Sequence, residues 1–500
     1  MKKYINNIIM MLIAASLLTT SCTDKFKEIN TDPDSPASVP AANELAWAIW
    51  YISANFYDRW FMLDEPCAFA GYVAKLNYID ESRYQFRTGI QDSNWAEIYT
   101  CLNTLRDIQA KAAELGARNL LNAAKVLEVH IMSIATDRWR DLPYSDAVNL
   151  SEGVLNPTYD VQEDIYPALL ATLKEVADDW ANGAGGDDLS GGDLLYGGDI
   201  NQWQRYCNSL RLRLATRLSV VSASLAQQTV TEIATNPSRY PFIENNDDNA
   251  FFWWDAGDAT RWEPLADAYR TRPGVEFCAP DVMIDNFKAN NDPRLSKYFE
   301  PAVSDGEYRG YIIGAAANTA PGGMSHWSYA YEQDLGGFSP WFRAAESWFA
   351  IAEAATRGWN VGISAQDAYE KAVTSSMDEN GVTAEETEAY LAGAGAFPSG
   401  SADEQRNKLW YEQWAAMFKN GMEGWTLYRR TGIPDFLYVA PGRGLASASY
   451  LNHNWGPLRS PYPDTERNLN TANNAPFNAD VVDDLWGKQM WWDQRVGVNN

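Results

Sequence analysis

Apolar side chains recur along this 500-residue chain at spacings that only an α-helix brings onto one face. Three stripes show this spacing, at Leu120, Ala124, Leu127, Ile131 and Ile134, at Trp203, Cys207, Leu210, Leu214, Leu218 and Val221, and at Trp341, Ala345, Trp348, Ala352 and Ala355. Further helices are predicted near 43–62, 92–115, 161–181, 365–379 and 402–420. We therefore predict a mainly α fold of stacked helical hairpins with little β structure. A strict 34-residue tetratricopeptide consensus is absent.

Two segments interrupt the helical pattern. Segment 183–199 is rich in glycine and aspartate and leads into the helix predicted from Asn201. The second segment, from about 237 to 340, alternates aromatic clusters with turns and shows little helical periodicity. Roughly 100 residues are long for a structureless loop within a helical protein, and such insertions are usually functional. We expect 237–340 to be a loop-rich binding region.

The charge of the chain restricts its partners. The sequence holds 66 acidic and 40 basic residues, a net charge of −26. Nucleic-acid binding depends on neutralising phosphates with Lys and Arg, so this balance argues against it and against adhesion to an anionic membrane. The 21 Trp and 26 Tyr are mostly expected in the core. Aromatic rings outside the helical stripes are candidates for stacking on flat ligands such as sugar rings.

Residues that commonly form metal and nucleophilic sites are few and scattered. No two of the cysteines 67, 101, 207 and 278 have metal-ligand spacing, and His130, His326 and His453 lie far apart. The sequence has no G-x-S-x-G motif, no P-loop and no dinucleotide fingerprint. We therefore predict neither a metal site nor a cofactor.

Two features leave alternatives open. The cysteines Cys67, Cys101, Cys207 and Cys278 are compatible with two disulfides in an oxidising compartment, but we expect buried free thiols. The carboxylates of Asp187, Asp188, Asp193 and Asp199 suit calcium, but they lack EF-hand spacing. We expect a turn with solvated acids there.

The N-terminus has the features of an export signal. Lys2 and Lys3 precede an apolar run over 8–18, which is too short to span a bilayer. Small polar residues and then Cys22 follow, and this order resembles a bacterial lipobox, in which the cysteine is acylated. We predict a signal peptide over 1–21, a lipid-attached Cys22 and a polar tether over 22–40. Loss of the two signal lysines changes the net charge from −26 to about −28.

A set of short motifs recurs in order between 137 and 466. They are DRWRDLPYSDA at 137–147, GDI at 198–200, NSLRLRLA at 208–215, NDPRL at 291–295, AAESWFAIAEAA at 344–355, EGW at 423–425, RRTGIP at 429–434, and Arg459, Tyr462 and Glu466. Together they resemble the SusD/RagB family of outer-membrane lipoproteins. Arg140 replaces the usual glycine of the first motif, and the lysine usual after Gln413 is missing.

The resemblance implies a fold and a function. It implies one SusD-like domain over 41–500, built from tetratricopeptide-like hairpins. It also implies a nutrient-binding lipoprotein at the outer membrane that captures an oligosaccharide, another glycan or a peptide. The family delivers its ligand to a SusC-like TonB-dependent transporter, without catalysis. The lipid at Cys22 and the 22–40 tether would then permit motion of a lid.

Two other classes of function stay open. A surface-anchored glycoside hydrolase would use a pair of carboxylates, and no pair stands out among 66 acids. A structural or adhesive surface protein would bind no small ligand.

The family motifs themselves are interpreted as scaffold. We expect Asn208, Arg211 and Arg213 to form buried contacts with helix carboxylates such as Glu346 or Glu353, because unpaired buried charges cost several kcal/mol. Arg429 and Arg430 are expected to bind carbonyls or a carboxylate. The predicted ligand-binding residues lie outside the motifs and the stripes, and they are Tyr78, Asp80, Arg83, Arg261, Trp262, Tyr269, Trp327 and Tyr329.

Overall fold

The computed structural model describes residues 39–317, 320–435, 453 and 455–498. The chain separates into two compact units, Met1–Pro40 and Ala41–Asn500, and the described helices and strands all belong to the second. The predicted signal peptide, Cys22 and the tether as far as residue 38 lie outside the described residues. Among the described helices, none combines the length and the apolar character needed to cross a bilayer.

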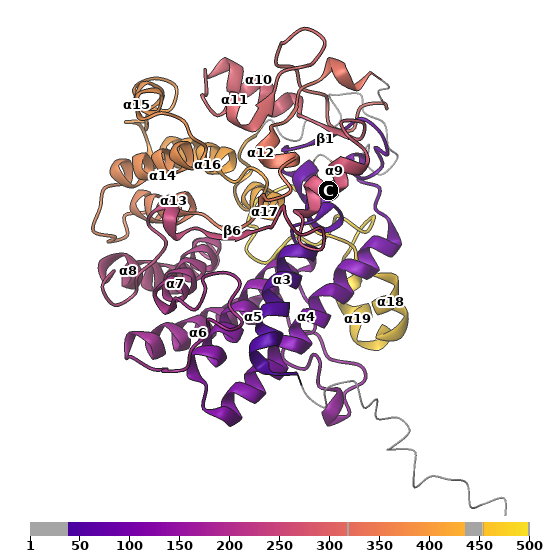
Figure 1. Ribbon diagram of the computed structural model, residues 1–500, viewed down its shortest axis with the longest axis vertical. Helices are drawn as coiled ribbons and strands as arrows, with labels where there is room; N and C mark the ends of the chain where they lie inside the picture. Colours follow the sequence, from indigo (N-terminus) through magenta and orange to yellow (C-terminus); the bar gives the residue numbers. More distant parts are fainter. Residues whose placement is uncertain (1–38, 318–319, 436–452, 454, 499–500) are drawn as a thin grey trace, which may run out of the picture. The chain divides into compact units, whose positions relative to one another are not determined.

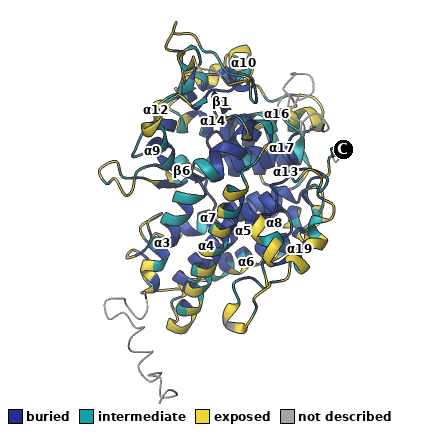
Figure 2. Cartoon of the chain, turned by 90° about the vertical axis from the view of Figure 1, so that its right-hand side faces the viewer, coloured by how far each residue is buried: buried dark blue, intermediate teal, exposed yellow. Residues whose placement is uncertain are grey.

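The fold is mainly α-helical, as predicted, and its long helices pack in sequence order as stacked hairpins (Figure 1). Their bounds are α3 (Ala41–Asn55), α4 (Thr88–Leu115), α5 (Arg118–Trp139), α6 (Gln162–Ala181), α7 (Ile200–Arg217), α8 (Ala223–Thr235), α13 (Ala344–Thr356), α14 (Ala365–Glu379), α15 (Ala384–Ala392), α16 (Ala402–Ala416) and α17 (Gly421–Thr431). Each helix from α4 to α7 packs on the next, and α7 also packs on α13. Between α4 and α5 the chain reverses at Gly116, whose positive φ of 66° favours glycine. Buried residues concentrate in helices such as α5 and α13 (Figure 2).

The predicted helices are confirmed except at some ends. The helix predicted over 43–62 stops at Asn55, and a separate π-helix, η1 (Arg59–Cys67), follows it. The break occurs because the Asp58 carboxylate caps the new helix, accepting a 2.7 Å hydrogen bond from the Phe61 amide. Trp341 belongs to a strand and not to α13, because strand β6 continues as far as Phe342.

Segment 237–340 contains short strands and helices that its sequence pattern did not reveal. Three antiparallel two-stranded sheets pair β1 with β3, β2 with β6 and β4 with β5. The strands are β1 (Ala74–Lys75), β2 (Ala250–Trp253), β3 (Phe277–Cys278), β4 (Phe299–Glu300), β5 (His326–Trp327) and β6 (Phe338–Phe342). The short helices are α9 (Pro264–Thr271), α10 (Asp281–Ala289), α11 (Leu295–Tyr298) and α12 (Tyr329–Glu332). Elements this short contain too few residues to display a period.

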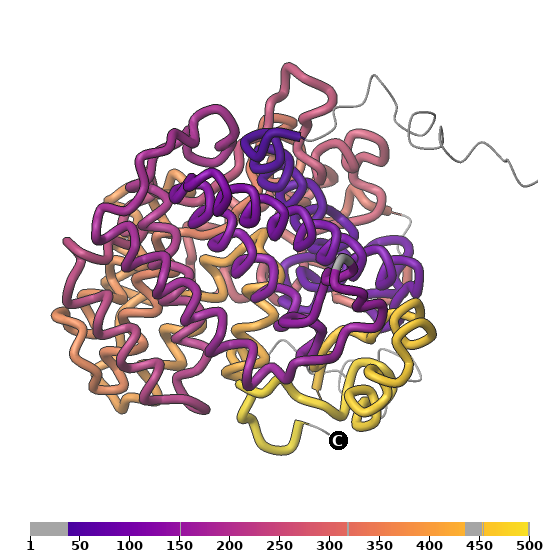
Figure 3. Tube along the Cα trace, turned by 90° about the horizontal axis from the view of Figure 1, so that it is seen from below, coloured from indigo at the N-terminus to yellow at the C-terminus, as the bar shows by residue number. Residues whose placement is uncertain are grey.

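Tryptophan side chains attach irregular segments to the helices. The indole N–H of Trp139 donates to the Pro461 carbonyl at 3.0 Å, and that of Trp425 donates to the Pro457 carbonyl at 3.0 Å. Trp414 likewise donates to the Ala70 carbonyl at 2.7 Å. The C-terminal segment with α18 (Asp464–Leu469) and α19 (Thr471–Asn478) is thereby held beside the N-terminal helices (Figure 3). Large aromatic area and a satisfied N–H together explain why these tryptophans are buried.

Buried ion pairs join the helices, as the motifs predict. Arg213 contacts Glu346 at 2.5 Å and donates to the Trp341 carbonyl at 2.8 Å. Arg211 bonds to Asn208 and to Glu232 instead of to either predicted carboxylate. Glu346 of α13 thus pairs with Arg213 as predicted, whereas Arg211 pairs with a carboxylate of α8.

The second predicted carboxylate, Glu353, pairs with two other arginines. Its oxygens lie 2.6 Å from Arg430 and 2.8 Å from Arg357, and it also accepts from the Trp410 indole at 2.7 Å. Arg429 donates to the carbonyl of Asp137 at 2.7 Å. The expectation that the two neighbouring arginines bind a carboxylate and carbonyls is confirmed.

Two acidic side chains of segment 183–199 accept hydrogen bonds from amides at helix N-termini. The Asp187 carboxylate accepts from the amides of Asn119 and Leu120 at 2.8 and 2.9 Å, at the start of α5. Asp199 caps α7 through the Asn201 amide at 2.8 Å. Carboxylates are favoured at these positions because helix N-termini carry unpaired N–H groups and a partial positive charge. Within the described ranges, no cluster of three or more His, Cys, Asp and Glu could hold a metal ion.

The cysteines in the described part of the chain are free thiols, as expected. Cys67, Cys101, Cys207 and Cys278 are all buried and unpaired with one another. Burial raises the pKa of the Cys207 thiol to about 12, so the reactive thiolate is suppressed.

The pairing of Glu353 predicts a pH dependence of stability. Burial alone would raise its pKa, but Arg430 and Arg357 lower it from 4.5 to about 2. The folded carboxylate thus contributes stability that is present above pH 4.5 and lost as the pH falls towards 2. We expect Glu353→Gln to lower the free energy of unfolding at pH 7 by about 3 kcal/mol, at about 1.4 kcal/mol per pKa unit.

Urea unfolding at pH 7 and at pH 3 measures this effect. The difference in the free energy of unfolding between wild type and Glu353→Gln should be smaller at pH 3 than at pH 7. The exposed Glu388→Gln is the control and should unfold like wild type at both values. If Glu353→Gln lowers the free energy of unfolding by the same amount at both pH values, the low pKa of Glu353 is contradicted.

Candidate ligand-binding site

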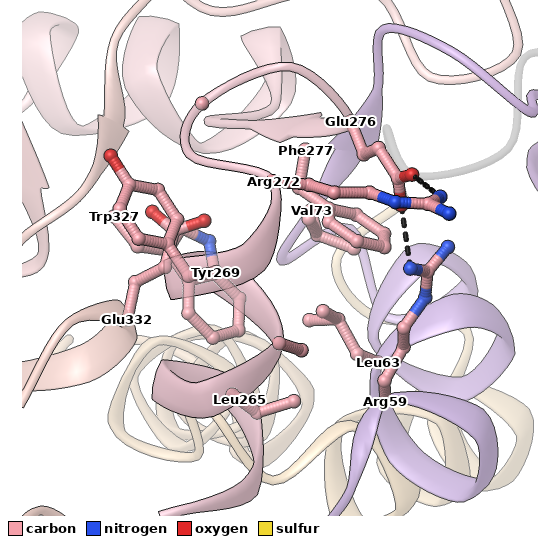
Figure 4. A pocket seen from close by; sticks show the side chains of 12 residues that line it. Arg59, Leu63, Val73, Leu265, Tyr269, Arg272, Glu276, Phe277, Trp327 and Glu332 are labelled. Atoms are coloured by element: carbon pink, nitrogen blue, oxygen red, sulfur yellow. Dashed lines mark hydrogen bonds and ion pairs between the residues drawn. The ribbon is translucent and has the colours of Figure 1, made fainter. Parts of the chain in front are cut away.

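A cleft lies between α9 and the π-helix η1, and we call it the α9 cleft. Its inner cavity of about 20 Å³ is lined by residues of η1, α9 and the β3 region (Figure 4). The cavity adjoins an outer cleft of about 550 Å³, and the two share Arg59, Ala268 and Arg272 in their walls. The outer wall includes Trp60, Tyr78 and other residues that approach from α4 and the β1 segment. Concave sites with a mixed apolar and polar lining are the usual form of small-ligand sites.

One wall of the cleft is α9, which is anchored at its first turn. The buried Glu263 carboxylate accepts from the Ala266 amide at 2.7 Å and pairs with Lys419 at 3.1 Å. Pro264 follows it at the first helical position, where a missing N–H costs nothing. The helix is therefore fixed to the core, and its outer face can present side chains to the cleft.

The opposite wall is the π-helix η1, a rare backbone form that occurs often at functional sites. Arg138 of α5 holds it from the core side, donating to the Phe61 carbonyl and the Glu65 carboxylate, each at 2.8 Å. Asp58, at its start, has a pKa raised to about 7 by burial. This carboxyl therefore changes its charge near neutral pH at the edge of the outer cleft.

Ion pairs cross the cleft and join its two walls. Arg59 of η1 contacts Glu276 at 2.6 Å, and Arg272 pairs with the same carboxylate (Figure 4). Lys75 of β1 continues the charged wall, since it lies 3.2 Å from Asp64 and 2.5 Å from Glu81. The arginines are thus held in place with N–H groups on the cleft lining.

Aromatic rings at the mouth are associated with these arginines. The Arg59 guanidinium lies 4.5 Å from the Trp60 ring centre, and that of Arg87 lies 5.6 Å from it. Arg272 lies 5.8 Å from the Tyr78 ring, which is 56% exposed. Cation–π contacts of this kind restrain rings whose faces can still receive a ligand. The mouth therefore offers flat apolar surfaces beside hydrogen-bond donors.

The inner cavity ends at Tyr269, Trp327 and Glu332 (Figure 4). Trp327 is buried, and its N–H donates to the Tyr72 carbonyl at 2.9 Å. Glu332 is buried too, and its Oε2 atom has no hydrogen-bond partner among the described residues. Burial and then the nearby Glu300 raise the pKa of Glu332 well above 4.5, which favours the neutral acid. Burial and then Glu332 raise the pKa of Tyr269.

The structure brings three of the predicted ligand-binding residues to this cleft. Tyr269 and Trp327 line the inner cavity, and Tyr78 lines the outer cleft. Tyr329 is 58% exposed at the start of α12, three residues before Glu332.

Tyr329 and the other four predicted residues lie outside the lining of the α9 cleft. Arg261 pairs with Asp255 and Asp258 in the turn that precedes α9, and the Trp262 indole donates to the Ala256 carbonyl at 3.1 Å. Arg83 donates to the Gly314 carbonyl at 2.8 Å, and Asp80 is exposed at the start of η2 (Glu81–Arg83). Their part in binding stays a prediction.

Sequence reasoning missed Arg59, Trp60, Arg272 and Glu332. Arg59 and Trp60 fall inside the helix predicted near 43–62, whose pattern marks neither residue as part of a site. The signal available was the charged pair Asp58-Arg59 beside Trp60 in an otherwise apolar helical stretch, which is typical of a helix boundary. No sequence pattern around Glu332 indicates that it is buried, because its burial arises from tertiary packing of α12 on α9.

Comparison with protein families gives one match that covers most of the chain. The family model SusD-like_2, described as "Starch-binding associating with outer membrane", matches residues 45–463. No curated protein matches the chain.

Solved structures share the fold over 91–92% of this chain. A chitin-binding protein shows 23% identity over 91% of this chain and 100% of its own, with a TM-score of 0.78. A SusD homologue from Bacteroides thetaiotaomicron shows 25% identity over 92% and 100%, with a TM-score of 0.74. A chitin-binding SusD homologue from Flavobacterium johnsoniae shows 22% identity over 91% and 97%, with a TM-score of 0.74.

The buried Glu332 predicts a pH effect opposite to that of Glu353. Because its folded pKa is raised, the folded state is stabilised at low pH and loses this stability as the pH rises above 4.5. We expect Glu332→Gln to raise the thermal unfolding midpoint at pH 8, with a smaller gain at pH 4. The exposed Glu307→Gln should leave the midpoint unchanged at both pH values. A loss of stability at pH 8 would show that Glu332 is ionised and paired.

Proposed function

The chain belongs to the SusD-like family, and on that premise we propose that it is a cell-surface glycan-binding lipoprotein. In this proposal it captures an oligosaccharide and delivers it to a SusC-like TonB-dependent transporter. The observation that carries the proposal is the α9 cleft, where the rings of Trp60 and Tyr78 lie beside fixed arginine donors.

The chemistry of the cleft suits a sugar. A pyranose ring has apolar C–H faces, which stack on aromatic rings, and a rim of hydroxyls, which need donors and acceptors. Arg59 and Arg272 supply donors, and a neutral Glu332 both donates and accepts. The mixed lining therefore suits an uncharged oligosaccharide.

The family description and two structural relatives support a glycan as the ligand class. The family is described as starch-binding, and the two relatives are described as chitin-binding. A peptide is the alternative ligand, and a mixed array of glycans and peptides separates the two. The same array identifies which sugar the protein binds.

The proposed route to the transporter uses the N-terminus. Acylation of Cys22 would anchor the chain, and the polar tether over 22–40 would let the helical unit move as a lid on its partner. Co-purification of a SusC-like transporter with the tagged full-length protein tests this association.

The glycoside hydrolase alternative requires two carboxyl groups at the bond to be cleaved. Glu276 and Glu332 both line the inner cavity, and Glu332 favours the protonated form that a general acid needs. However, Glu276 is paired with Arg59 and Arg272, which occupy the oxygens that a nucleophile or base would use. We propose binding without bond cleavage; new reducing ends that disappear in Glu332→Gln would establish the hydrolase instead.

Binding should depend on the rings at the mouth. We expect Trp60→Ala and Tyr78→Ala each to weaken oligosaccharide binding about 3- to 10-fold, the effect of losing about 0.5–1.5 kcal/mol of stacking. Isothermal titration calorimetry with a glycan identified on the array measures this change.

Leu469→Ala is the matched control, since Leu469 is 77% exposed on α18, away from the lining of the cleft. The control should bind like wild type. Unchanged affinity in both aromatic variants, with wild-type unfolding midpoints, would remove the outer cleft from the site.

The anchor has a separate test. Cys22→Ser should move the protein from the outer-membrane fraction to the soluble fraction and abolish incorporation of a labelled fatty acid, because its thiol is the proposed acylation site. Cys207→Ser, at a buried cysteine, is the control and should keep the label. Retention of the Cys22→Ser variant in the membrane would contradict the lipid anchor.

A further inference from the structure

A second hollow lies apart from the α9 cleft, and we call it the Trp253 groove. It has a volume of about 530 Å³ and lies between the β2–β6 sheet, α12 and the end of α14, elements labelled in Figure 1. Its lining includes Asp247, Trp253, Lys297 and Asp378 and shares no residue with the lining of the α9 cleft.

Trp253 is the unusual residue of this groove. It is 63% exposed, whereas its neighbours Phe252 and Trp254 are buried at 5% and 7%. Leaving so large an apolar ring in water forgoes the stabilisation that its burial would provide. Most tryptophans of this chain are buried instead, so the exposed ring requires an explanation beyond packing.

Two phenylalanine rings pack against the Trp253 ring and hold it in place. Its centre lies 5.3 Å from the Phe338 ring and 6.1 Å from the Phe251 ring, and those two rings stack at 4.7 Å. Phe338 is its partner across the antiparallel β2–β6 pair. A ring fixed on a sheet loses little conformational entropy when a ligand stacks on it.

Polar groups with free bonding capacity surround this ring. Asp247 is exposed, and within the described ranges its carboxylate makes no hydrogen bond or close ion pair. The half-buried Lys297 ammonium makes none to a described residue either. Asp378 is exposed and accepts one bond, from Asn246 at 2.9 Å. The rim therefore offers one cationic donor and two carboxylate acceptors.

We infer that the Trp253 groove is a second glycan-binding site, in which a pyranose ring stacks on Trp253 and its hydroxyls bond to Asp247, Lys297 and Asp378. The ligand class rests on the proposed function. A flat apolar face with a rim of mixed donors and acceptors is the combination that a pyranose complements. A single ring above a polar hollow is too little apolar area for a stable protein interface, which buries about 800 Å² on each partner.

The two sites meet at α12. This four-residue helix places Ala330 and Tyr331 in the wall of the Trp253 groove and Glu332 in the wall of the inner cavity. A glycan that contacts both sites would therefore bind on two sides of the same helix. Two contacts on one chain raise affinity by effective concentration.

The test compares calorimetric titrations of the full-length protein with maltohexaose and with chitohexaose. We expect Trp253→Ala to weaken binding of the hexasaccharide that wild type binds by about 3- to 10-fold. Lys297→Met should weaken it as well, without removing an aromatic ring. Val303→Ala, at a residue 87% exposed outside both sites, is the matched control and should bind like wild type.

The outcomes separate the two proposals. Unchanged affinity in both Trp253→Ala and Lys297→Met, with wild-type unfolding midpoints, would overturn the second site while leaving the α9 cleft intact. Loss in Trp253→Ala with no loss in Trp60→Ala and Tyr78→Ala would support the second site and overturn the α9 cleft. Wild-type protein that binds neither hexasaccharide would overturn the second site for these glycans, and a negative array would overturn the proposed function.

Discussion

The fold depends on arginine side chains that are buried among helices and neutralised there. Arg294 has no exposed side-chain surface, and it contacts Asp292 and Glu412 at 2.6 Å each. Removing such charges from water costs several kcal/mol per ion, and only near-ideal contacts repay it. Glu412 lies 118 residues further along the chain. A pair of this kind therefore fixes which hairpins can pack together, because a shifted helix would leave a buried charge without its partner.

The same kind of contact reaches the α9 cleft. Arg138 belongs to α5, inside the helical stack, and its guanidinium holds the π-helix through Glu65 and the Phe61 carbonyl. On the far side of that π-helix, Arg59 extends to Glu276. The cleft wall is thus connected to the scaffold by a short series of charged contacts. A site supported in this way is formed before its ligand arrives, which lowers the entropy cost of binding.

The sequence predicted the long helices well because their stripes extend over several turns, as in α6 and α14, where burial follows a simple period. It failed where one capping side chain decided the outcome, as Asp58 did in ending the helix predicted over 43–62. It also found Tyr78 and Tyr269 as aromatic rings outside the stripes. It could not find Glu332, whose burial and raised pKa arise only when α12 packs on α9. Sites built from short elements depend on contacts that no local pattern records.

The placement of the arginines also determines where the charge of the protein lies. Arg213, Arg217, Arg294 and Arg343 are all buried against carboxylates, so much of the positive charge is neutralised in the interior. The net charge of −26 is therefore carried mostly by solvent-facing carboxylates. Neighbouring copies of the chain repel one another at low ionic strength, and salt screens that repulsion over about 8 Å at physiological strength. Each buried pair removes one positive and one negative group together, so the excess of acidic charge that causes this repulsion is left outside the pairs.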